Sequence, residues 1–220
     1  MKTDMQLQKD VQDELRWTPS VRDAEIGVAV KDGVVTLTGY VQNHAQKLAA
    51  DQASKRVGGV RALADDLKVK LPFSRERSDT DIAHAALRAL DWDTEVPDKA
   101  VTVTVNDGWL SLQGNVEWQF QKTAAERAVR YLNGVRGVIN SIMITPKGAS
   151  PAKVSERIKD ALKRSAEYDA DHVKVSAVDG KVTLSGTVRS WTERSDAELA
   201  AWSAPGVREV VDRIMISSAL

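Results

Sequence analysis

The chain has 220 residues, in which 31 Lys and Arg are balanced by 31 Asp and Glu, and it contains no cysteine. The lack of cysteine excludes disulfides, thiolate chemistry and cysteine-ligated zinc sites. The charge balance excludes a chain that is attracted as a whole to nucleic acid, and no run of about 18 apolar residues predicts a transmembrane segment.

The first third of the chain predicts a helix, a hairpin, a second helix and a strand. Apolar residues at four-residue spacing predict a helix over 4–16. Alternating apolar residues then flank Asp32-Gly33, a pair typical of a two-residue hairpin turn. A second helix is expected over 44–57, before the last strand. Gly39 falls on the buried face, where its missing side chain is expected to let a helix approach.

The same order of elements returns twice, with an Asp-Gly turn and a glycine six residues later in each copy. Three domains of αββαβ order are therefore expected, over residues 4–71, 78–145 and 150–217. The glycines that mark the turns, the close approaches and the ends of the second helices are Gly33, Gly39, Gly59, Gly108, Gly114, Gly134, Gly180, Gly186 and Gly206.

Six tryptophans stand out, since only two Phe and three Tyr accompany them. Trp17 and Trp92 end the first helices of their repeats and are expected to cover an edge of the sheet. Trp109 is expected on the outer face of a strand, and Trp118 and Trp191 where the second helices begin. One interpretation is packing between repeats; the other is an aromatic rim that inserts into a bilayer interface or holds an apolar ligand.

Basic side chains add to this candidate ligand surface in the third repeat, where Lys174 and Lys181 share the outer face of the sheet. Each basic residue near an anionic surface contributes about 1 kcal/mol. Lipid binding would therefore need avidity from several repeats or insertion of tryptophan. The candidate surface comprises Trp109, Trp118, Trp191, Lys174 and Lys181.

Catalytic, metal and cofactor sites are not predicted. His44, His84 and His172 occupy unrelated places in their repeats, which indicates surface or capping roles rather than a metal site. The glycines precede strands and lack the Gly-Lys-Ser/Thr of a phosphate loop. No nucleophile with an adjacent base can be recognised, so the sequence predicts a protein that is not an enzyme.

The threefold pattern of a leading helix, an Asp-Gly hairpin with its later glycine, a second helix and a Gly-Val pair before the last strand resembles the BON domain. That family is named for bacterial osmotically inducible and nodulation proteins. Its members tend to carry an asparagine in the third strand; Asn140 fits this pattern, whereas Asp65 and Asp212 stand in the other repeats. The resemblance implies an α+β fold in which two helices cover one face of a three-stranded mixed sheet.

The resemblance also implies a non-enzymatic protein, without a cofactor, that binds phospholipid or another hydrophobic ligand in a bacterial osmotic or envelope stress response. The alternative is a cytoplasmic protein-interaction scaffold or ion-responsive module, which the charge balance favours. No nucleic-acid partner is expected. The N-terminus lacks the apolar core of a signal peptide, so the chain as written is expected in the cytoplasm, and a longer precursor would place it in the periplasm.

Overall fold

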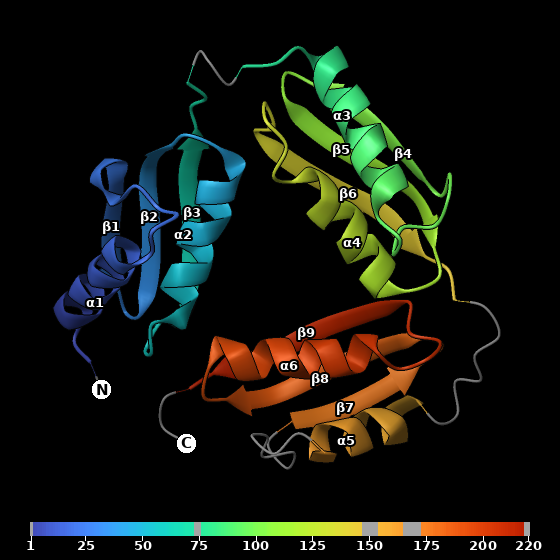
Figure 1. Cartoon of the computed structure of the whole chain (residues 1–220). Helices are drawn as coiled ribbons and strands as arrows, with labels where there is room; N and C mark the ends of the chain where they lie inside the picture. The colour runs from blue at the N-terminus through green and yellow to red at the C-terminus, as the bar shows by residue number, and fades with distance from the viewer. Residues whose placement is uncertain (1, 73–75, 147–153, 165–172, 218–220) are drawn as a thin grey trace. The chain divides into compact units, whose positions relative to one another are not determined.

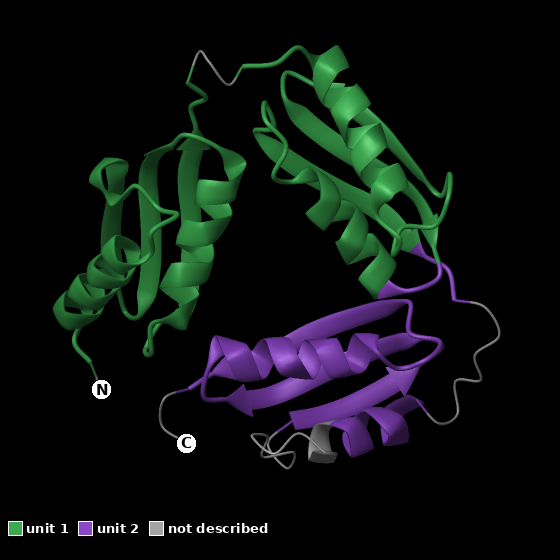
Figure 2. Ribbon diagram, viewed as in Figure 1, with its two compact units in different colours: residues 1–116, 120–143 green, residues 117–119, 144–220 purple. Residues whose placement is uncertain are grey.

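The computed structural model describes residues 2–72, 76–146, 154–164 and 173–217. His172 and the expected start of the third repeat at Ser150 lie outside the described residues. The chain divides into two compact units, one made of residues 1–116 and 120–143, the other of residues 117–119 and 144–220 (Figure 2).

The first repeat has the expected order of elements. They are α1 (Asp4–Trp17), β1 (Ile26–Lys31), β2 (Val34–Val41), α2 (His44–Arg56) and β3 (Ala62–Val69), with a short 3-10 turn at Asp23–Glu25. The central strand β2 pairs antiparallel with β1 and parallel with β3. Both helices lie on one face of this sheet, and the other face carries no helix of the repeat (Figure 1).

The second and third repeats have the same topology. Their elements are α3 (Asp79–Trp92), β4 (Val101–Asn106), β5 (Trp109–Val116), α4 (Gln119–Val129) and β6 (Gly137–Ile144), then α5 (Val154–Arg164), β7 (Val173–Val178), β8 (Lys181–Val188), α6 (Trp191–Trp202) and β9 (Glu209–Ile216). The strand orders are β4-β5-β6 and β7-β8-β9. The predicted α+β architecture of three αββαβ units is confirmed.

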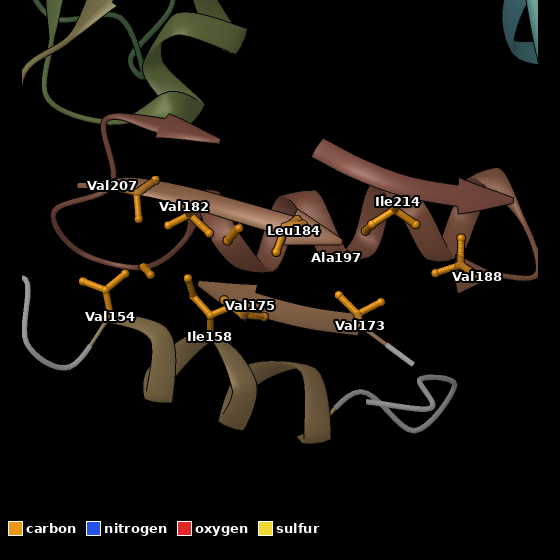
Figure 3. Close-up of a cluster of buried hydrophobic side chains, with 12 residues drawn as sticks. Val154, Ile158, Val173, Val175, Val182, Leu184, Val188, Ala197, Val207 and Ile214 are labelled. Carbon is orange, nitrogen blue, oxygen red and sulfur yellow. The ribbon is translucent and has the colours of Figure 1, made fainter. Parts of the chain in front are cut away.

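Each core is formed between the inner face of one sheet and the apolar sides of its two helices. In the first repeat the predicted helical stripe of Leu7, Val11 and Leu15 is buried, as are Val35 and Leu37 on β2. Figure 3 shows the corresponding cluster of the third repeat, which is drawn from all five of its elements. Alternation along the strands therefore sends every second side chain to the opposite, open face of the sheet.

The Asp-Gly pairs form the predicted hairpin turns, since Asp32 and Gly33 both have positive φ values, 52° and 76°. The expectation for Gly39 is wrong in one respect: no helix lies over it. A Cβ on Gly39 would lie 2.0 Å from the carbonyl oxygen of Glu25, and its φ is +113°. The glycine therefore admits the backbone that leads into the neighbouring strand.

Candidate ligand-binding surfaces

Two tryptophans at equivalent places are the most exposed large side chains of the described residues. Trp17 at the end of α1 is 82% exposed, and Trp92 at the end of α3 is 89% exposed. The expectation that they cover a sheet edge is therefore wrong. Each follows the last buried leucine of its helix, Leu15 or Leu90, by two positions, and a step of two residues turns a helix by about 200° away from the core.

The surroundings of Trp92 form a shallow depression of about 680 Å³ between α3 and α4. Its wall includes the stem of Arg88 and the small side chains Ala89 and Ala128, with Asp93 and Thr94 at the helix end. The depression offers an apolar floor with one basic and one acidic group beside it. Such a surface holds an apolar group next to a polar head.

Trp118 and Trp191 are partly buried where the second helices of their repeats begin. Trp191 is the first residue of α6, and the guanidinium of Arg194 lies 5.2 Å from the centre of its ring. A cation over the ring face is a favourable contact inside the protein. Trp191 is therefore already engaged by a side chain of its own helix.

Trp109 lies on the open face of the second sheet and is 50% exposed, as the strand alternation predicts. Its six-membered ring covers Gly137 on β6, because a Cβ built on that glycine would lie 2.3 Å from Cζ3 of the indole. One side of the ring thus packs on the sheet. Half of the residue remains available for a ligand.

The two lysines of the predicted surface differ in their electrostatic role. Lys181 Nζ lies 2.8 Å from Glu209 Oε1 on the neighbouring strand, so its charge is neutralised locally. Lys174 is exposed on β7. The structure thus distributes the five predicted residues over the open faces of two different sheets and the starts of two helices.

The third-strand position of Asn140 has one shared function in all three repeats. Its side-chain oxygen accepts the backbone N–H of the residue two places further on, at 3.2 Å for Asn140, 3.0 Å for Asp65 and 2.8 Å for Asp212. This hydrogen bond fixes the orientation of the side chain against the backbone of its own strand. Aspartate and asparagine both supply the acceptor oxygen, so this hydrogen bond forms with either residue at the position.

The other terminal atom of this side chain faces the neighbouring helix; it is a carboxylate oxygen in Asp65 and Asp212 and the amide nitrogen in Asn140. Its partner on the helix differs between the repeats. In the aspartate repeats it meets a cation: Lys47 lies 3.4 Å from Asp65, and Arg194 donates to Asp212. In the asparagine repeat the amide donates to the carbonyl of Lys122 at 3.0 Å. The side chain at this position therefore connects the third strand to the second helix of its repeat, and we assign it a structural role rather than a role in ligand binding.

The two histidines that the structure describes, His44 and His84, have separate surroundings. His84 is exposed on α3. His44 begins α2 with a partly buried ring, and the expected capping role belongs instead to Asn43, which accepts the N–H of Gln46 at 2.9 Å. Burial lowers the pKa of His44 below its usual value of 6.5, and the charge of Lys47 lowers it further.

Within the described ranges, no three or more His, Cys, Asp or Glu side chains gather as a metal site would require. None of the helices described here is long and apolar enough to cross a membrane.

The comparisons with known proteins agree on one family. The sequence model of the BON domain matches three times, at residues 3–70, 78–146 and 151–217. Osmotically-inducible protein Y of Escherichia coli (strain K12) is 31% identical over 130 residues, which cover 56% of this chain and 63% of that protein's length.

Solved structures of CdsD, a structural protein of the type III secretion system of Chlamydia trachomatis, also align with the chain. One covers 95% of this chain and 91% of its own, the other 98% and 100%, each at 15% identity and a TM-score of 0.27. A TM-score this low carries no argument about fold or function.

Proposed function

The chain belongs to the BON-domain family, and on that premise we propose that it is a non-enzymatic protein of a bacterial osmotic stress response that binds phospholipid or another hydrophobic ligand. The name of its Escherichia coli relative, an osmotically inducible protein, supports the stress assignment. The relative is matched over less than two thirds of its length, so the assignment rests on the shared domains.

One observation carries the binding proposal: Trp17 and Trp92 project from equivalent helix ends and are 82% and 89% exposed. An indole gains by leaving water for a bilayer interface, where its apolar body and its N–H are both accommodated. We therefore propose these two side chains as the main membrane contacts, with Trp109 and Lys174 as secondary ones.

The charges beside the two tryptophans predict how binding responds to salt. Arg16, next to Trp17, lies 3.4 Å from Asp13 and 3.2 Å from Asp23, so its charge is balanced. Arg88 lines the depression beside Trp92. Asp93 lies 3.6 Å from Arg127, which also lies 2.6 Å from Glu95, so acidic side chains accompany the basic ones here too. Because neither surface is strongly basic, binding should depend on tryptophan insertion more than on anionic lipid, and salt should weaken it little.

Flotation with vesicles tests the proposal. Vesicles of phosphatidylcholine, alone or mixed with phosphatidylglycerol, are used at low and at physiological salt. The wild type should float with both, with a blue shift of tryptophan emission, and the Trp17→Ala/Trp92→Ala variant should stay unbound. Phe120→Ala is the matched control, since Phe120 is also exposed, at 52%, on another helix. Failure of the wild type to float under every condition would contradict lipid binding and favour the protein-interaction alternative.

A further inference from the structure

The open face of the second sheet differs from the other two in charge. Every strand position on this face of β4, β5 and β6 holds an uncharged residue. On the first sheet the equivalent face carries Asp66 and Lys68, and on the third it carries Lys174 and the Lys181–Glu209 ion pair. The difference is sharpest at one position, because Trp109 stands where the third repeat has Lys181 and the first has Val34.

The apolar part of this face is exposed along β6, where Ser141 separates two apolar side chains. Ile139 and Met143 are 51% and 63% exposed, and the indole of Trp109 covers Gly137 at the start of the same strand. Asn140, between them in sequence, is turned to the helix side, where it binds α4. An exposed apolar strip of this kind marks a binding surface more often than a free one.

The polar part of the face consists of hydroxyls and amides. Register places Asn106 opposite Trp109, Thr104 opposite Ser111 and Thr102 opposite Gln113. Such side chains both donate and accept hydrogen bonds without any net charge. A ligand for this face should therefore have many donors and acceptors, no formal charge and at least one flat apolar side.

These features exclude several partner classes. A phosphate headgroup or a nucleic acid would find no cation on the sheet, and an attraction to anionic lipid needs several basic side chains. A purely apolar ligand would leave the hydroxyls and amides unpaired, which costs binding energy. A sugar ring provides both an apolar side and hydrogen-bonding groups without charge. It presents C–H groups on its faces and hydroxyl groups around its rim.

We propose that the open face of the second sheet binds a neutral carbohydrate, with a sugar ring stacked on Trp109 and its hydroxyls bonded to Asn106, Ser111 and neighbouring polar side chains. Ile139 and Met143 extend the apolar contact surface along β6 on either side of the hydroxyl of Ser141, so the face suits an oligosaccharide better than a single sugar. This site is separate from Trp17 and Trp92, the main membrane contacts proposed above, which lie on helices.

Titration of the full chain with maltohexaose and with cellohexaose, followed by the indole N–H signals in NMR spectra, tests the inference. At least one of these neutral sugars should bind with a dissociation constant of about 1 mM or tighter. Trp109→Val should weaken binding about tenfold, the size of a lost stacking contact. Valine is the matched replacement, because Val34 occupies this position in the first repeat.

Trp92→Ala, on helix α3, is the control that should leave sugar binding unchanged. The inference is overturned if neither sugar shifts the Trp109 signal at about ten times the expected dissociation constant, or if Trp109→Val binds as the wild type does. It is also overturned if sedimentation shows a dimer that Trp109→Val abolishes, since the face would then cover a second copy. The lipid proposal is decided separately, because Trp109→Val removes only a secondary membrane contact and should still float with vesicles through Trp17 and Trp92.

Discussion

The carboxylate of Asp212 on β9 accepts a hydrogen bond from the guanidinium of Arg194 on α6. The same carboxylate accepts the N–H of Ile214, so one side chain connects the last strand to its own backbone and to the helix. The equivalent residue of the second repeat is Asn140, which reaches a helix carbonyl without needing a cation. The helix carries a cation at the equivalent place in every repeat, and in the second repeat Lys122 donates to the carbonyl of Ile142. The charge of the strand residue is what differs.

The pairing predicts a compensating double substitution. Arg194→Met leaves a largely buried carboxylate unpaired and should cost about 2 kcal/mol of unfolding free energy. Adding Asp212→Asn should restore most of this loss, because the amide keeps the acceptor for Ile214 and needs no cation. Urea unfolding of the single and double variants measures the coupling. If the double variant is less stable than Arg194→Met, the amide does not replace the ion pair in this repeat.

A second prediction concerns the carboxylates that hold the hairpin turns. Asp79 Oδ2 accepts the N–H of Asp107 at 2.8 Å, and Oδ1 accepts the N–H of Gly108 at 2.9 Å. Asp4 does the same for the first turn, at 2.8 Å and 3.1 Å. Each carboxylate therefore ties the start of a helix to a turn distant in sequence.

Asp79→Ala should cost about 2 kcal/mol, because two charge-assisted hydrogen bonds are lost together. Asp79→Asn should cost less, since the amide keeps one acceptor oxygen. The control is Asp91→Ala, an exposed change on the same helix that should stay within about 0.5 kcal/mol of the wild type. Equal stability of the alanine and wild-type chains in urea would show that the turn forms without the carboxylate.

A third prediction follows from the close approach at Gly114. A Cβ there would lie 2.0 Å from the carbonyl oxygen of Ala100, and φ is +145°. Gly114→Ala should therefore cost about 3 kcal/mol or more, because neither the backbone angle nor the contact can be relieved locally. Gly58→Ala is the matched control: a Cβ on Gly58 meets nothing within 4 Å, so its effect should be small. A similar thermal unfolding midpoint for both variants would contradict this account.

The sequence predicted the fold well because its local signals agree. The Asp-Gly turns, strand alternation and helical stripes, such as Leu7, Val11 and Leu15, each determine local structure, and together they leave one topology. The partner of Gly39 was missed because Glu25, in the 3-10 turn just before β1, is distant from it in sequence. The recurring glycine in the sequence pattern shows that no side chain fits at this position. It does not show which group of the protein occupies the space.

The surfaces were harder to predict. Trp17 and Trp92 were assigned to the sheet edge although their two-residue step from a buried leucine already indicates an outward direction. The uncharged face around Trp109 depends on register, which places side chains from three strands together. The ion pair that neutralises Lys181 likewise joins strands far apart in sequence.

The last prediction concerns pH. Burial, followed by the charge of Lys47, lowers the pKa of His44 in the folded chain below its ordinary value of 6.5. The unfolded chain therefore takes up a proton at a higher pH than the folded chain does. Stability should be constant above about pH 7, should fall as the pH drops through 6.5, and should stop falling below the folded pKa of His44.

His44→Gln isolates this contribution, because glutamine is polar and does not titrate. The difference in unfolding free energy between wild type and variant, measured in urea from pH 7.5 to 5, should change in favour of the variant as the pH falls. A pH dependence that is the same in wild type and His44→Gln would show that the ring is no more buried in solution than in the unfolded chain.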